Sequence, residues 1–379
     1  MNLLTPKLRF NEFSNGWPRC TLKDTFTIHY GKDHKLLSDG IYPLLGSGGV
    51  MRYVSSYLYD KPSVLIGRKG TIDKPQFIST PFWTVDTLFY TEIKNNFVPY
   101  FVYLLSLRIR WKKYSEATGV PSLNVTSIYG IQINVPSVEE QQKIADFLTA
   151  VDTKINQLTE KHRLLKEYKK GVMQQIFSQQ LRFKDKDGKA FPDWKSYPLK
   201  KVLSLQSDTL NMLDDETYEL ITVKRGFGGV VSRGLFKGKD VLVKNQFTIH
   251  ENEFVISKRQ IVHGACGLVP AALNGAIVSN EYNVFRPVEH LLDIDYFNRF
   301  TATPLMRRAF FINSDGVHIE KLLFKTQSWL KTKVTLPCLE EQQKIAQFLQ
   351  ALDSKIAAVS EQIEQTKQFK KGLLQQMFV

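Results

Sequence analysis

The sequence has few cysteines and no cluster of metal-binding side chains. Its three cysteines, Cys20, Cys266 and Cys338, lie far apart, and no pair has the spacing of a disulfide framework or of a metal site. We interpret them as reduced, mostly buried thiols. The seven histidines are scattered as well. The sequence therefore predicts no metal on this chain.

Long apolar runs are also missing. No stretch reaches the roughly 18 apolar residues that a transmembrane helix needs. The first residues, from Met1 to Lys7, lack the basic-then-apolar order of a signal peptide. We therefore expect a cytoplasmic protein.

Three kinds of short string resemble parts of catalytic sites, and each departs from its pattern. The glycine strings at 46–49 and 225–229 lack the following helix and acidic partner of a nucleotide or S-adenosylmethionine site. Asp86 is too close to the Glu-x-Lys string at 92–94 for a nuclease metal site, and nothing equivalent occurs in the second half. Residues 134–137 come nearest to the Asn/Asp-Pro-Pro-aromatic motif of adenine methylation, but the aromatic is absent. The sequence thus predicts no catalytic residue.

What the sequence does contain is a long internal repeat. Residues 136–145 recur as residues 337–346, and both copies include Glu-Glu-Gln-Gln-Lys-Ile-Ala. The match continues without a gap, at an offset of about 200 residues, to a Lys-Lys-Gly string near the end of each copy. A weaker repeat relates the Leu-Arg-Phe strings at 8–10 and 181–183. The chain is therefore a duplicated module, in which each globular segment is followed by one repeated element.

Each repeated element is predicted to be a helix of about 40 residues, or roughly 60 Å. Pro136 and Pro337 mark the two starts. Ser137 and Glu140 have the spacing of a capping box, in which each side chain satisfies a free amide of the first turn. Cys338 stands where the second copy would need the serine, so we expect a weaker cap there.

Apolar residues follow each helix at alternating steps of four and three, which is the period of a coiled-coil seam. We expect the two helices to pack antiparallel against each other; the alternative is that they belong to separate cores. Lys169 and Lys370 interrupt the seam at equivalent positions, and Gly171 and Gly372 follow, so both helices are expected to loosen or bend near their ends. The seam, which we also expect to dock partner subunits, includes Ile144, Leu148, Val151, Ile155, Leu158, Ile345, Leu349, Leu352, Ile356 and Val359.

The two globular segments, 1–136 and 194–336, have a different pattern. They are rich in Tyr, Phe, Ile, Val and Thr, in short runs separated by Gly, Pro, Asn and Asp. This pattern predicts α+β domains with more strand than helix.

The positive charge is concentrated in these globular segments. The chain carries 51 Lys and Arg against 37 Asp and Glu, a net charge of +14. Segment 1–136 has 16 basic against 9 acidic residues and segment 194–336 has 19 against 14, whereas the rest of the chain is nearly balanced. We therefore expect the globular domains to contact nucleic acid, and the helices to act as spacers or partner surfaces.

Position along the chain selects candidate DNA contacts. Arg68, Lys69, Lys258 and Arg259 each come just after an apolar strand-like run. Arginine can bind guanine through two hydrogen bonds, whereas lysine acts mainly on phosphate; the plainer alternative for each is a solubilising surface charge. Gly119 and Gly316 lie in polar turns before each helix, which either approach DNA closely or are ordinary turns. Weaker candidates are Arg52, Arg225, Arg233 and Arg308, with Lys35, Lys224 and Arg307.

The order of these elements resembles the specificity subunits of type I restriction-modification systems. The motifs that carry the resemblance are the Pro-x-x-Glu-Glu-Gln-Gln-Lys-Ile-Ala string that opens each helix, the Lys-Lys-Gly-x-x-Gln-Gln string near each helix end, and the junction from 181 to 194. The resemblance covers the whole chain. It implies an α+β protein with two strand-rich target-recognition domains, separated by two long antiparallel coiled-coil helices in a pseudo-twofold repeat. The expected divisions are recognition domain 1 (1–136), central spacer helix (137–180), connector (181–193), recognition domain 2 (194–336) and C-terminal spacer helix (337–379).

The resemblance also implies a mechanism. Each recognition domain reads one half of a split double-stranded DNA target, and the helices set the unread spacer. Two methyltransferase subunits bind around the helices and carry the S-adenosylmethionine chemistry on adenine N6, and motor-nuclease subunits use ATP and Mg²⁺. This chain holds no cofactor itself. The rival interpretations are a self-contained DNA methyltransferase or nuclease, and a coiled-coil adaptor with no role on DNA.

Overall fold

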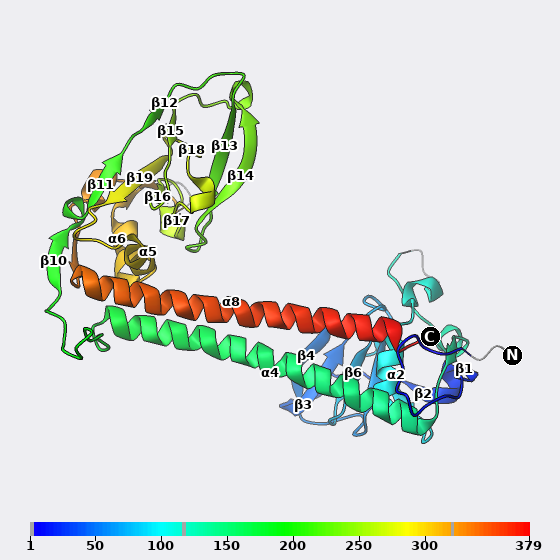
Figure 1. Cartoon of the computed structure of the whole chain (residues 1–379). Helices are drawn as coiled ribbons and strands as arrows, with labels where there is room; N and C mark the ends of the chain where they lie inside the picture. The colour runs from blue at the N-terminus through cyan, green and yellow to red at the C-terminus, as the bar shows by residue number, and fades with distance from the viewer. Residues whose placement is uncertain (1–3, 116–118, 320–321) are drawn as a thin grey trace. The chain divides into compact units, whose positions relative to one another are not determined.

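The computed structural model describes residues 4–115, 119–319 and 322–379 (Figure 1). The chain divides into two compact units. The first unit comprises residues 1–161 and 359–379, and the second comprises residues 162–358. Both long helices, α4 (Val138–Phe177) and α8 (Leu339–Gln376), have residues in each unit. A unit is therefore a globular domain together with the beginning of one long helix and the end of the other.

The first unit contains three small sheets and short helices. Its elements are β1 (Arg19–Thr21), α1 (Leu22–Thr25), β2 (Phe26–Tyr30), β3 (Asp39–Gly46), β4 (Gly49–Val54), β5 (Ser63–Gly67), β6 (Gln76–Ile78), β7 (Trp83–Thr84), β8 (Leu88–Ile93), α2 (Pro99–Ser106), η1 (Trp111–Tyr114), α3 (Val125–Tyr129) and β9 (Gln132–Asn134). The strands pair in the orders β2-β8-β5-β6, β4-β3-β7 and β1-β9.

The second unit contains the remaining short elements. They are β10 (Lys195–Pro198), η2 (Leu199–Lys201), β11 (Leu203–Gln206), β12 (Thr209–Leu210), β13 (Thr217–Val223), β14 (Val230–Lys237), η3 (Gly238–Asp240), β15 (Gln246–Thr248), β16 (Phe254–Ser257), η4 (Ile261–His263), β17 (Cys266–Leu268), η5 (Ala271–Leu273), β18 (Ile277–Ser279), β19 (Tyr282–Pro287), α5 (Ile294–Thr301), α6 (Pro304–Ile312), β20 (Ser314–Asp315), β21 (Leu323–Phe324), α7 (Thr326–Trp329) and β22 (Lys333–Leu336). The strand orders are β11-β19-β16-β17, β12-β15-β18-β13-β14, β10-β22 and β20-β21.

The internal repeat extends from sequence to topology. The antiparallel sheet β2-β8-β5-β6 of the first unit has the same pairing as β11-β19-β16-β17 of the second. In both units a hairpin strand also pairs in parallel with a later strand, β3 with β7 and β13 with β18. The predicted α+β class, with two strand-rich domains and two long helices, is confirmed.

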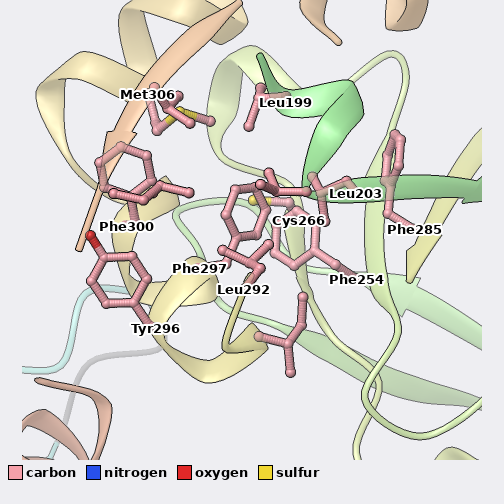
Figure 2. Close-up of a cluster of buried hydrophobic side chains, with 14 of the residues drawn as sticks. Leu199, Leu203, Phe254, Cys266, Phe285, Leu292, Tyr296, Phe297, Phe300 and Met306 are labelled. Atoms are coloured by element: carbon pink, nitrogen blue, oxygen red, sulfur yellow. The ribbon is translucent and has the colours of Figure 1, made fainter. Parts of the chain in front are cut away.

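Aromatic side chains fill the core of the second unit. In Figure 1, α5 and α6 lie between the four-stranded sheet and α8. Figure 2 shows Phe297 of α5 beside Phe254 and Cys266, and the Phe254 and Phe297 rings meet edge to face with centroids 5.2 Å apart. Burial raises the pKa of the Cys266 thiol to about 12, so this cysteine is protonated at neutral pH. It behaves as a small apolar core residue.

The ends of the long helices are part of these cores. Leu148 of α4 packs in the first unit with Leu373 of α8, and Ile176 of α4 packs in the second unit with Ile345 of α8. Most of the predicted seam is buried. Part of it lies in the cores of the two domains, as expected from the alternative that the helices belong to separate cores. The buried seam residues are Ile144, Leu148, Leu158, Ile345, Leu349, Leu352 and Val359, whereas Val151, Ile155 and Ile356 are half-buried.

The predicted capping box is only half formed. The Ser137 hydroxyl accepts from the Glu140 amide at 3.4 Å, but the Glu140 carboxylate does not return to the helix start. It is 2% exposed and accepts from Arg9 Nε and Nη2, both at 2.7 Å, and from Trp17 Nε1 at 3.3 Å. Because a buried carboxylate needs partners, this glutamate joins the chain's first segment to α4.

The second copy repeats this ion pair. Glu341 is fully buried and accepts from Arg182 Nε at 2.7 Å and Nη2 at 2.8 Å, and from Trp194 Nε1 at 3.2 Å. The weak repeat of Leu-Arg-Phe, which is followed by Trp17 in the first copy and Trp194 in the second, therefore has a physical reason. In each unit it supplies the partners of the buried glutamate in the repeated helix motif.

The glutamine that follows each buried glutamate joins its helix to the globular domain. Gln141 accepts from the amide of Val98, at the start of α2, at 3.0 Å, and donates to the Pro136 carbonyl at 3.0 Å. Gln342 accepts from the amide of Asp293, at the start of α5, at 2.9 Å. The repeated Glu-Gln pair is therefore a structural anchor.

The seam lysines have partners on the opposite long helix. Lys370 binds Asp152 in the first unit, and Lys169 binds Asp353 in the second. These contacts, with the packing of each helix start against the other helix's end, make the two helix segments antiparallel within each unit. Both α4 and α8 continue as α-helix past Gly171 and Gly372, so the predicted loosening is not observed.

Candidate nucleic-acid interface

A buried strand of the first unit leads directly into a basic loop. All five residues of β5 are buried, and Arg68 and Lys69 follow where the chain reaches the surface. A Cβ on Gly67 would lie 2.2 Å from the Thr71 carbonyl oxygen, so the tight turn after β5 requires glycine. The strand thus presents two cations at a defined position.

Arg68 is held by neighbours that leave it half-exposed. Its Nη1 donates to the Asp86 carbonyl at 3.2 Å, and its guanidinium lies 5.5 Å from the centroid of the Tyr30 ring. An arginine oriented by an aromatic ring and one carbonyl loses less side-chain entropy when it binds a base or phosphate. Tyr30 was not among the candidates selected from the sequence.

The glycine turn of the first unit joins this basic loop. The Leu123 amide donates to the Arg68 carbonyl and the Gly70 amide donates to the Pro121 carbonyl, both at 2.9 Å. Lys69 and Ser122 form an antiparallel bridge. Gly119 lies in the same turn, and a Cβ added to it would have no described atom within 4 Å. Thr118, the residue before Gly119, lies outside the described residues.

The second unit makes the same connection. Lys258 and Arg259 follow the fully buried strand β16, and the Phe324 amide donates to the Lys258 carbonyl at 3.0 Å. Phe324 belongs to β21, whose partner β20 leads into the turn that carries Gly316. In both units, therefore, two features selected separately from the sequence lie side by side.

The two basic loops differ in their charge partners. Arg259 Nε donates to Glu281 at 2.6 Å, and both side chains are about half-exposed. The hydrogen bond and the charge of Glu281 raise the pKa of Arg259. Lys258 Nζ donates to the Asn280 carbonyl at 2.5 Å. Since an exposed ion pair contributes little to stability, a DNA group can displace Glu281.

Arg52 has a structural role that weakens its candidacy. Its guanidinium donates to Asp39 at 3.0 Å, to the Leu37 carbonyl at 2.9 Å and to the His34 carbonyl at 3.1 Å. These bonds tie the loop before β3 to strand β4. Nothing in its sequence neighbourhood distinguished this arginine from a DNA contact.

The other weaker candidates lie on separate elements of the second unit. Arg233 is on β14, with its guanidinium 5.8 Å from the Phe236 ring, and Arg308 is exposed on α6. Arg307, also on α6, lies over the Phe227 ring at 4.5 Å. Arg225 is in the turn between β13 and β14.

A family comparison identifies the class of protein. The model of the family described as type I restriction modification DNA specificity domain matches residues 15–166 and 193–368, which is most of the chain. The chain belongs to this family. It is a DNA sequence-specificity subunit of a type I restriction-modification system, and such specificity subunits are not catalytic by themselves.

Known relatives agree with this assignment. The specificity subunit is 25% identical over 337 residues to the type I restriction enzyme MjaVIII specificity subunit of Methanocaldococcus jannaschii, covering 82% of this chain and 74% of that one. The crystal structure of the type I restriction-modification S subunit from M. genitalium has the same fold, with a TM-score of 0.64, 14% identity and 99% of each chain covered. A structure that describes complex assembly and conformational transition of the type I R-M system has a TM-score of 0.53 at 12% identity, covering 95% of this chain and 97% of that one.

Membership of the family defines the partners in general terms. A specificity subunit acts on DNA together with other subunits of its restriction-modification system. Within residues 4–115, 119–319 and 322–379, no helix is long and apolar enough to cross a membrane. The same residues contain no group of three or more His, Cys, Asp or Glu side chains suited to a metal ion.

Proposed function

We propose that each unit of the specificity subunit reads one half of a bipartite duplex DNA target, through its basic loop and the adjoining glycine turn. The observation that carries this proposal is the repeated hydrogen bond from Leu123 to Arg68 in one unit and from Phe324 to Lys258 in the other. The excess of basic residues in both globular segments supports the same surface.

The chemistry of the loops divides the work between base and backbone. The Arg68 and Arg259 guanidinium groups can each donate two hydrogen bonds to O6 and N7 of a guanine in the major groove. Lys69 and Lys258 act as point charges on phosphate. The two units therefore contribute independent half-sites.

The two long helices are proposed to set the spacer between these half-sites. Each helix has residues in both units: α4 joins the two recognition domains covalently, and the end of α8 packs in the core of the first unit. Seven residues inserted in each helix, after Lys161 and before Val359, preserve the seam and add roughly 10 Å. We expect the unread spacer to grow by about three base pairs, since each base pair rises about 3.4 Å.

Partner subunits are proposed to dock on the outer faces of the helices. The seam residues expected from sequence to dock them are largely buried, whereas Leu164 is 49%, Tyr168 54% and Phe369 55% exposed. We assign these faces to two methyltransferase subunits that carry S-adenosylmethionine, with motor-nuclease subunits that use ATP and Mg²⁺. The complete complex works in the cytoplasm, where its DNA is.

The proposal is tested by mapping methylated adenines in cells that carry this subunit with its methyltransferase. Arg68→Ala is expected to relax one half-site and Arg259→Ala the other, with roughly 5- to 150-fold loss of discrimination at one base pair. Uniformly weaker binding with an unchanged preference would demote both arginines to phosphate contacts. Methylation or cleavage by the purified chain alone, with S-adenosylmethionine and Mg²⁺, would support the self-contained enzyme instead.

A further inference from the structure

A glycine-rich hairpin tip lies beside the basic loop of the first unit. The tip, residues 46–51, comprises the end of β3, the turn and the first residues of β4, and it contains the first of the glycine strings that lack the pattern of a nucleotide site. The Ser47 hydroxyl lies 3.5 Å from the position that a Cβ on Gly70 would take, and Gln76 Nε2 donates to the Gly46 carbonyl at 3.0 Å. The tip is therefore held next to Arg68 and Lys69.

The second unit places the equivalent hairpin tip in the same neighbourhood. This tip, residues 224–229, joins β13 to β14 and contains the second glycine string. The Gly226 amide donates to the His263 carbonyl at 2.7 Å, and the Phe227 amide donates to the Gly264 carbonyl at 2.8 Å. His263 and Gly264 follow Arg259 by only a few residues. The second tip therefore also adjoins a basic loop.

The first tip carries two apolar side chains that are more than half exposed. Val50 is 53% and Met51 is 59% exposed, although both types are usually buried. A Cβ added to Gly48 or Gly49 would have no described atom within 4 Å, so the tip is open on that side. Strand β4 is also an edge of its sheet. We take this open, partly apolar strand end as a surface available to another molecule.

Two observations favour DNA over a protein as that molecule. The equivalent tip of the second unit carries Lys224 and Arg225, which suit a polyanion. Both tips are continuous with the basic loops described above. A two-stranded ribbon fits the major groove, where arginine recognises guanine and apolar side chains contact the thymine methyl group.

We propose that the two hairpin tips are a second reading element of the recognition domains, and that Met51 contacts the methyl group of a thymine in the first half-site. This inference rests on the proposed half-site reading. It extends the reading surface from the basic loops to the two glycine strings, whose sequences lack the pattern of a nucleotide or S-adenosylmethionine site.

The test uses the complete methyltransferase complex and duplex DNA carrying the mapped target. Each thymine of the first half-site is replaced in turn by uracil, which lacks only the methyl group. We expect one replacement to weaken binding by about fourfold, the contribution of one buried methyl-sized group. Met51→Ala is expected to weaken binding to the thymine target to a similar extent and to abolish the effect of that uracil.

Ile41→Ala is the matched control, since Ile41 is 78% exposed on the neighbouring strand β3 but lies away from the tip. It is expected to retain the wild-type response to uracil. A first half-site without thymine, or the same uracil response in wild type and Met51→Ala, overturns the inference. Loss of partner-subunit binding by Met51→Ala, with an unchanged uracil response, also overturns it and identifies a protein-docking surface. Failure of the unaltered complex to bind specific DNA at all is a different result, which overturns the proposed function itself.

Discussion

Lys370 donates to both carboxylate oxygens of Asp152, at 2.6 and 2.7 Å, although the two residues are 218 positions apart. The Tyr100 hydroxyl donates to the same carboxylate. In the second unit Lys169 binds Asp353, and Arg299 Nη1 donates to it at 2.6 Å. Each globular domain is therefore completed by the end of the other copy's helix, and the ionic contact is repeated with a different third partner.

Lys370→Met is expected to destabilise the first unit selectively. The substitution leaves Asp152, whose side chain is 28% exposed, without its cation. The expected loss in the free energy of unfolding is about 1–3 kcal/mol. Hydrogen exchange resolved by peptide should show faster exchange in the first unit and little change in the second. Lys371→Met, on the exposed neighbouring residue, is the control. Equal effects of the two variants would contradict the role of this pair.

Arg182→Ala is expected to be more damaging, because Glu341 is fully buried. Removing the cation leaves a buried charge without its main partner, at a cost of about 3–5 kcal/mol to the second unit. Thermal unfolding of the variant measures this loss. Arg182→Ala combined with Glu341→Gln should recover part of the stability, since the unpaired charge is gone. No recovery would mean that the arginine acts through packing alone.

Acid is expected to weaken the second unit through Asp353. Partial burial raises the pKa of this carboxyl, but the hydrogen bonds from Lys169 and Arg299 lower it more, so its folded pKa is depressed. The stabilisation is therefore fully present above the unfolded value of about 3.9 and is lost as the pH falls through the folded value. Hydrogen exchange across this acidic range should show the loss of stability of the second unit. Asp353→Asn should remove the part of the pH dependence of stability that this carboxyl contributes.

Glu281→Gln is expected to strengthen DNA binding. The substitution removes the carboxylate that pairs with Arg259 at 2.6 Å, and with it one negative charge beside the basic loop. Affinity for non-target DNA should rise a few-fold at low salt, with a steeper salt dependence. Titrations at two salt concentrations measure both effects. Unchanged binding would show that this loop does not face DNA.

The sequence by itself determined the features that depend on local patterns. The seam period and the prolines predicted two long helices close to their observed bounds, because a helix imposes its repeat on neighbouring residues. The repeated motif predicted the duplication. The apolar runs before Arg68 and Lys258 predicted two buried strands that each end at a basic loop. Strands β5 and β16 have this arrangement. The family resemblance was confirmed.

Only the tertiary structure decided which of these residues meet. Glu140 matched a helix cap by its spacing, yet its carboxylate pairs with Arg9, 131 residues away. Lys370 interrupted a seam, yet it has an ionic partner on the other long helix. Arg52 had the chemistry of a DNA contact, but it is bound to its own hairpin. Contacts between distant segments are set by packing and charge compensation in the folded chain, and no local spacing encodes them.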